Sequence, residues 1–210
     1  MTISEPMTML TDYLLAAVVA VLALRLYAEG HATGQRAMRW WAGAFLATAL
    51  AAAVGGTFHG FALILDAATI RELRRVTFLA IGIAAFLMLQ GSIVASVGGH
   101  ARRPLLWANV LKLVVDILWL WSQNDFGVAA YNYVASMLAI LLLEVRMAVS
   151  SFGPRSRWVL LGLGVSFGAA GLQQAELGLH RHFNHNDLYH VIQMAAFWAL
   201  YRGGRLLRDK

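Results

Sequence analysis

Long apolar stretches separated by short polar ones cover almost the whole chain. A helix needs about 20 mostly apolar residues to cross the roughly 30 Å hydrocarbon core of a bilayer. Seven stretches meet this requirement, at residues 10–28, 39–61, 75–97, 104–122, 129–149, 158–179 and 187–206. Continuous apolar runs exclude membrane β-strands, in which polar and apolar residues alternate. The pattern therefore predicts an all-α polytopic membrane bundle of seven transmembrane helices.

The polar connections between these stretches are short, so we expect one integral membrane domain that spans residues 1–210. The first seven residues, MTISEPM, contain no lysine or arginine. A cleavable signal peptide normally begins with a basic segment. The first apolar run is therefore expected to stay in the protein as a helix.

Composition supports a membrane protein. Hydrophobic residues make up 60% of the 210 residues and charged residues only 13%, whereas a soluble domain carries about 25% charged residues. The chain has no cysteine, which excludes disulfides, thiolate nucleophiles and thiolate metal ligands.

The net charge of +6 is distributed unevenly between the two ends of the predicted bundle. One end collects Arg25, Arg36, Arg39, Arg102, Arg103, Arg146, Arg155, Arg157, Arg202, Arg205, Arg208 and Lys210. The other end has Arg71, Arg74, Arg75 and Arg181. Cytoplasmic loops of membrane proteins are enriched in basic residues, which predicts an outer N-terminus and a cytoplasmic C-terminus. The basic residues then lie near anionic lipid headgroups, and no nucleic-acid partner is needed to explain them.

Histidines gather at the predicted outer end. Five of the seven fall there, from parts of the chain that are far apart: His59, His180, His182, His185 and His190. Polar side chains at membrane depth usually face the interior of a bundle, where they find partners. Such a cluster is what a binding or catalytic site at one mouth of the bundle requires.

The last predicted helix carries a polar face. Asn186, His190 and Gln193 are spaced i, i+4 and i+7, which places them on one side of a helix. Asn184 followed by Asp187 is typical of a helix N-cap with an acidic third residue. We therefore expect the helix to begin close to His185.

The sixth predicted helix carries a matching stripe. Gln173, Glu176 and His180 are spaced i, i+3 and i+7 at the end of this helix, whose apolar run is predicted to end at residue 179. We expect this stripe to face the polar side of the last helix and His59. The alternative is that these amides and imidazoles only form hydrogen bonds that hold the helices together.

Imidazoles from separate helices are the ligands of catalytic zinc sites, which keep one position open for water. Zinc lowers the pKa of that water towards ~7 and so supplies hydroxide without a nucleophilic side chain. The candidate ligands are His59, His185 and His190, with His180 as a rival for the third position.

Two carboxylates accompany the candidate ligands. Glu176 and Asp187 are the candidate catalytic residues, as a general base or as groups that orient a ligand. We expect His182 to be a solvated loop residue.

Charged residues also occur inside predicted spans away from this end. Lys112 and Asp116 are spaced i, i+4 in the fourth run, which predicts an ion pair that satisfies itself. Its functional alternative is part of a proton or ion path. Glu144 and Arg146 lie near the inner end of the fifth run, where long side chains can reach the interface.

The arrangement resembles the superfamily of alkaline ceramidases and progestin and adiponectin receptors, which are seven-span proteins with metal-dependent hydrolase chemistry. The segment GGTFHG places His59 at the end of the second span, and FNHNDLYHVIQM places His190 at the start of the last. The resemblance implies a zinc ion held by histidines at these two places, and hydrolysis of a lipid amide. The closing segment also resembles uncharacterised bacterial membrane proteins, which implies a bacterial inner (plasma) membrane.

The chain departs from that superfamily at several positions. Gly55 stands where the superfamily has serine, and Asn186 stands where it has the first histidine of a pair, unless His185 replaces it. Asp66 follows His59 more closely in the sequence than the superfamily's acidic residue follows its first histidine. Glu72 is the next acidic residue along the chain.

Three classes of function follow. The leading hypothesis is a zinc-dependent membrane hydrolase that acts on a lipid or amphiphilic amide or ester near the outer leaflet. The second is a membrane protein that binds or transports a small solute through the same polar mouth. The third is haem ligation by two histidines from different spans. A retinal protein is excluded because the last span has no lysine for a Schiff base.

Overall fold

The structure is a computed structural model that describes residues 3–150, 153–180 and 182–210. Within these ranges the chain forms seven α-helices, one short 3₁₀ helix and no named strand. The helices are α1 (Pro6–Ala32), α2 (Arg36–Phe61), α3 (Ala67–Ser96), η1 (Gly99–Ala101), α4 (Arg102–Gln123), α5 (Phe126–Ser150), α6 (Pro154–Gln174) and α7 (His185–Gly204). The prediction of an all-helical protein is confirmed.

Five of the helices in the described ranges, α1 to α5, are long and apolar enough to cross a membrane. Their length and composition are consistent with a multi-pass membrane protein. The remaining two, α6 and α7, have 21 and 20 residues and carry more polar side chains. Seven spans, with the N-terminus outside, therefore remain a prediction.

Local signals in the sequence determine where the helices begin. Pro6 and Pro154 occupy the first turns of α1 and α6, where the missing backbone N–H costs nothing. Asp66 is the N-cap of α3, and its carboxylate accepts hydrogen bonds from the N–H groups of Ala68 and Thr69. This cap explains why α3 begins at Ala67, eight residues before the predicted start at residue 75.

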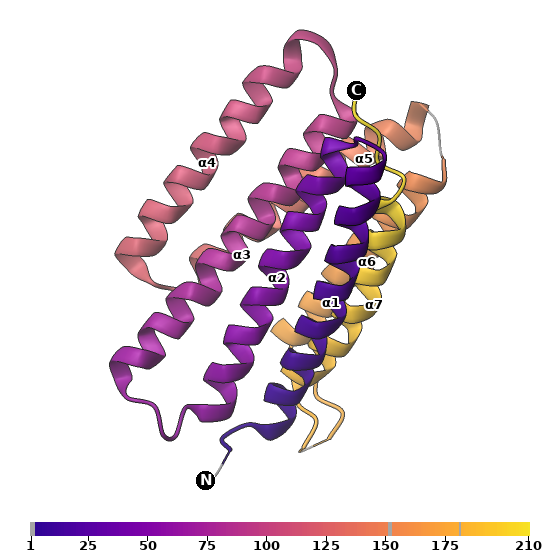
Figure 1. The fold of residues 1–210 in the computed structure, drawn as a ribbon. Helices are drawn as coiled ribbons and strands as arrows, with labels where there is room; N and C mark the ends of the chain where they lie inside the picture. The colour runs from indigo at the N-terminus through magenta and orange to yellow at the C-terminus, as the bar shows by residue number, and fades with distance from the viewer. Residues whose placement is uncertain (1–2, 151–152, 181) are drawn as a thin grey trace.

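The helices form antiparallel neighbours along the chain, and α7 closes the bundle by packing against both α6 and α1. The core lies where α1, α2, α3 and α7 meet, around the buried side chains of Leu26, Trp41, Phe45 and Leu200. In Figure 1, α4 lies on the outside of the bundle with α3 between it and α2. Consistent with that position, α4 packs against α3 and α5 and exposes most of its surface.

The segment after α7 folds back onto the bundle at the end where α2 begins. Asp209 accepts hydrogen bonds from the N–H groups of Arg36 and Ala37, the first residues of α2. Partial burial opposes ionisation of Asp209, but these bonds and Arg36 outweigh it and hold the pKa of the carboxyl below its usual range. Leu207 is fully buried and the Lys210 N–H donates to the Val94 carbonyl. The carboxylate of the tail thus caps α2 in place of a local residue.

Candidate functional site

A cavity of about 600 Å³ opens at the end of the bundle where α1 begins, α2 ends and α7 begins. It runs inward between α1, α2, α3 and α7. Both His59 of α2 and His190 of α7 line it, together with Glu5, Asp12 and Arg74. The structure therefore brings the two histidines of the second and last helices to one cavity.

The deeper histidine is held on both ring nitrogens. His190 Nε2 lies 3.2 Å from Asp12 Oδ1, and His190 Nδ1 lies 3.0 Å from Thr11 Oγ1. The side chains of Asp12 and His190 are only 6% and 10% exposed, so solvent screens this pair weakly. The Thr11 hydroxyl also lies 3.1 Å from the Thr8 carbonyl.

The single hydroxyl proton of Thr11 links these contacts. If Thr11 donates to His190 Nδ1, the Nε2–H group of the imidazole donates to the Asp12 carboxylate. If Thr11 donates to the Thr8 carbonyl, His190 Nδ1–H donates to the Thr11 oxygen instead. The contact between His190 Nε2 and Asp12 then holds a proton that the imidazole and the carboxylate share. Either arrangement keeps one proton in the Asp12–His190 contact.

Capping of α7 fixes the position of His190. Asn184 accepts hydrogen bonds from the N–H groups of Asn186 and Asp187, and the Asp187 side chain accepts one from the Asn184 N–H. The Asn184 amide also donates to Thr8 Oγ1 at 3.3 Å, which ties the start of α7 to α1. The predicted N-cap is thus confirmed, and it places His190 against α1.

Glycines of α2 bring this helix close to α1. A Cβ atom on Gly56 would lie 2.9 Å from Asp12 Cβ and 3.3 Å from the Met9 carbonyl oxygen, too close for any larger residue without a shift of a helix. At Gly55 a Cβ would lie 3.8 Å from both carboxylate oxygens of Asp12, in ordinary contact. Gly55 therefore leaves room beside the carboxylate that lines the cavity.

His59 forms a second carboxylate–imidazole pair near the mouth of the cavity. Its Nδ1 lies 3.0 Å from Glu5 Oε2, and its side chain is 26% exposed. The backbone supports this contact, because the N–H of Glu5 donates to the His59 carbonyl at 3.2 Å. With Nδ1 held by Glu5, Nε2 is the ring nitrogen available to a molecule in the cavity.

The inner part of the cavity adjoins a second, apolar chamber of about 240 Å³. The two share Leu15, Thr48, Ile81, Gln173 and Tyr189 as wall residues. The chamber lies between α3, α5, α6 and α7, and its walls include Tyr133, Val134, Met137, Leu163, Phe167 and Phe197. A polar mouth thus lies next to an apolar interior.

The polar faces of α6 and α7 meet as expected, although over fewer residues. The Gln173 amide donates to Asn186 Oδ1 at 2.9 Å, and the Ser166 hydroxyl donates to Gln193 Oε1 at 3.1 Å. Asn186, His190 and Gln193 lie on one side of α7, and the first two line the cavity.

The predicted extension of the sixth helix to residue 179 is wrong. The helix ends at Gln174, since Glu176 adopts a left-handed backbone with φ of 54°. The N–H of Glu176 donates to the Gln173 carbonyl and that of Leu177 to the Leu172 carbonyl, the Schellman pattern that ends helices. His180 consequently lies in the α6–α7 loop, where it pairs with Phe183.

The other candidate residues take different places. His185 is the first residue of α7 and is absent from the cavity wall, and Glu176 is exposed in the loop. Asp187 is buried behind the wall, where one carboxylate oxygen serves the N-cap. His182 is exposed, and Arg181 lies outside the described residues.

Asp66 and Glu72, the acidic residues weighed in the resemblance, do not line the cavity. Hydrogen bonds from the Thr69 backbone and hydroxyl hold the pKa of Asp66 below its ordinary value of 3.8. This is the behaviour of an N-cap carboxylate. Glu72 lies 2.7 Å from the Arg75 guanidinium on the surface of α3.

Asp12 is a site residue that the candidate residues drawn from the sequence did not include. It is a single carboxylate inside the first apolar run, LTDYLLAAVVAVLALRL. A charged side chain within a membrane helix is costly and normally needs an interior partner. That isolated charge is the signal in the sequence, but only the fold shows that its partner is His190, 178 positions away.

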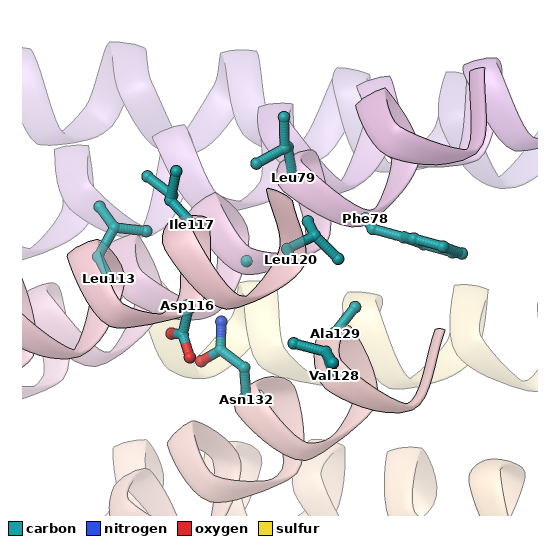
Figure 2. Close-up of a pocket in the computed structure, with 10 residues that line it drawn as sticks. Phe78, Leu79, Leu113, Asp116, Ile117, Leu120, Val128, Ala129 and Asn132 are labelled. Carbon is teal, nitrogen blue, oxygen red and sulfur yellow. The ribbon is translucent and has the colours of Figure 1, made fainter. Parts of the chain in front are cut away.

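The ion pair predicted in the fourth run forms as expected. Lys112 Nζ lies 3.1 Å from Asp116 Oδ2 and also contacts Asn132 Oδ1 of α5. Figure 2 shows Asp116 and Asn132 pointing towards each other between α4 and α5, among apolar side chains. The pocket beside them measures about 10 Å³, room for one water at most, which favours a structural role over a proton or ion path.

Glu144 differs from the prediction of a side chain that reaches the interface. It is fully buried and accepts hydrogen bonds from the Arg155 guanidinium and the Ser156 hydroxyl at the start of α6. Arg155 also donates to the Ala95 carbonyl and to Ser96 of α3. This pair therefore joins α3, α5 and α6.

Comparison with known proteins places the chain in a family without assigning it an activity. A family model described as a family of unknown function, DUF6962, matches residues 7–209. The chain belongs to this family. No curated protein matches it. The match covers the seven helices of the described residues except Pro6, the first residue of α1. It therefore includes every residue of the cavity and of the two carboxylate–imidazole pairs except Glu5.

Proposed function

We propose that the protein is a membrane hydrolase that cleaves an ester or amide bond of an amphiphile, near the outer leaflet of a bacterial inner membrane. One observation carries the proposal: the cavity with Asp12, His59 and His190 adjoins an apolar chamber and shares five wall residues with it. An amphiphile fits this shape when its polar group lies at the mouth and its hydrocarbon chain lies in the chamber. The mouth holds the groups that hydrolysis requires.

His59 is suited to act as the general base. Glu5 accepts from Nδ1–H and so leaves Nε2 to take a proton from water. The water oxygen then attacks the carbonyl carbon, and the same proton passes from Nε2 to the departing alcohol or amine as its bond to the carbonyl carbon breaks. The other hydrogen of the water stays on the attacking oxygen and leaves with the acid product.

The resemblance implies a zinc ion, but the placement of these residues does not suit one. Within the described ranges, no three histidine, aspartate or glutamate side chains are arranged to hold a metal ion. Thr11 and Asp12 already occupy both ring nitrogens of His190. The residues as placed do not fit a three-ligand centre, and the proposed steps use none.

Metal analysis of the purified protein tests the zinc hypothesis directly. One zinc per chain that is lost in His59→Ala and in His190→Ala would establish the metal centre. Equal trace amounts in the wild type and both variants would remove it.

The hydrolase proposal is tested with fluorogenic esters and amides of increasing acyl length and with protein in nanodiscs. We expect turnover of long-chain substrates, and a loss of about 100-fold in kcat for His59→Ala, in the range for a general base. Glu72→Gln, which removes an exposed carboxylate of α3 outside the cavity, is the matched control and should retain full activity. Equal turnover in wild type and His59→Ala would refute the assignment of the base.

Binding or transport of a small solute is the second candidate. It is favoured by the paired state of His190, whose two nitrogens are both engaged. Thermal stabilisation by an amphiphile without any cleavage would support this function over hydrolysis.

A further inference from the structure

We propose that a hollow at the opposite end of the bundle binds the phosphate of an anionic phospholipid. The hollow measures about 590 Å³ and lies where α2 and α4 begin. Arg36 of α2, His100 of η1, and Arg102, Arg103 and Leu106 of α4 line it. Residues from separate elements therefore present three guanidinium groups to one space.

The charges in this hollow do not cancel. Arg36 lies 3.1 Å from the Asp209 carboxylate, which neutralises one charge. Arg102 donates to a main-chain oxygen of Lys210, the last residue in the sequence. Arg103 is exposed, and no carboxylate within the described residues forms an ion pair with it. Counting Asp209 against Arg36 and the α-carboxylate of Lys210 against Arg102 still leaves the charge of Arg103 uncompensated, which matches an anionic ligand.

Guanidinium groups are suited to phosphate because their planar N–H donors match two phosphate oxygens at once. His100 adds a further donor to the wall, and the Lys210 ammonium lies nearby, 3.2 Å from the Ser96 carbonyl. The Asp209 carboxylate accepts hydrogen bonds from the first two N–H groups of α2 and is not part of the wall of the hollow.

The surroundings favour a lipid over a free anion. Leu106 lines the hollow, and the helices that leave it are apolar. In Figure 1, α4 lies on the outside of the bundle, with α3 between it and α2. Leu46 and Leu50 of α2 and Leu111 of α4 are each more than half exposed. Trp107, one turn into α4, is 71% exposed at the level where tryptophans meet headgroups.

Lipid binding is measured by native mass spectrometry of the detergent-purified protein. The probes are dioleoyl phosphatidylglycerol, dioleoyl phosphatidylcholine and inorganic phosphate. We expect phosphatidylglycerol to bind about tenfold more tightly than phosphatidylcholine, and its binding to weaken as salt rises. Millimolar phosphate should not displace it, because the acyl chains supply part of the affinity.

The decisive variant is Arg103→Gln, since this exposed side chain has no ion-pair partner whose loss would disturb the fold. It should lower phosphatidylglycerol binding about fivefold, and Arg36→Gln/Arg103→Gln should abolish the preference over phosphatidylcholine. Arg71→Gln, which removes an exposed arginine at the other end of the bundle, is the matched control and should change nothing. Equal binding by Arg103→Gln and Arg71→Gln, or no preference for the anionic lipid in the wild type, overturns the proposal. Displacement by phosphate alone overturns the lipid as the ligand.

Discussion

Two carboxylate–imidazole pairs in one cavity differ in their surroundings. Asp12 and His190 are buried at the contact between α1 and α7, whereas Glu5 and His59 are partly exposed at the mouth. Removing one partner of a buried pair leaves the charge of the other partner buried and unpaired, which is destabilising. When one partner of a partly exposed pair is removed, water can solvate the other, and little stability is lost. We therefore expect substitution of His190 to lower stability, and substitution of His59 to lower activity with little effect on stability.

Stability measurements on the two histidine variants test this difference. His190→Ala should lower the free energy of unfolding by about 3 kcal/mol, because it leaves the Asp12 carboxylate buried and unpaired. His59→Ala should change it by less than about 0.5 kcal/mol. Chemical denaturation in detergent, followed by tryptophan fluorescence, gives both values. Similar losses in the two variants would contradict the burial difference.

At the scale of elements, the contact between α1 and α2 positions Asp12. Small residues let these helices approach closely, and the sequence ATALAAAVGG already indicated such packing for α2. The sequence could not show which glycine faces the carboxylate, because that depends on the rotation of α1 about its own axis.

Adjacent glycines offer a matched test of this contact. Gly56→Ala should destabilise the protein by about 2 kcal/mol, since its Cβ would meet Asp12 Cβ and the Met9 carbonyl. Gly55→Ala, one residue earlier, has room and should have little effect on stability. Thermal unfolding of both variants in the same nanodiscs measures the difference. A larger loss for Gly55→Ala would show that the α1–α2 register is different.

Helix boundaries show which parts of the fold the sequence could predict. Apolar runs identified all seven helices, and the Asn184–Asp187 cap of α7 was recognised from residue type alone. The end of α6 was missed because Glu176, rather than glycine, adopts the left-handed conformation there. Glutamate is a normal helix residue, so no local signal marks that end.

At the scale of the whole molecule, the bundle has two differently charged ends. A cavity with Asp12 and Glu5 opens at one end, and the arginine-lined hollow lies at the other. His59 and His190 were predicted to gather from the spacing of apolar runs, since both stand at helix ends on the same side. Asp12 and the apolar chamber depend on long-range packing, which periodicity along the chain does not encode.

The central claim is that one cavity holds both the polar group and the hydrocarbon chain of an amphiphile. An experimental structure with a twelve-carbon ester that carries bromine at the end of its chain tests this most directly. The account predicts the ester carbonyl between His59 and Asp12, and bromine in the chamber near Phe167 and Phe197. Bromine found only on the outer, lipid-facing surface of the helices would contradict it.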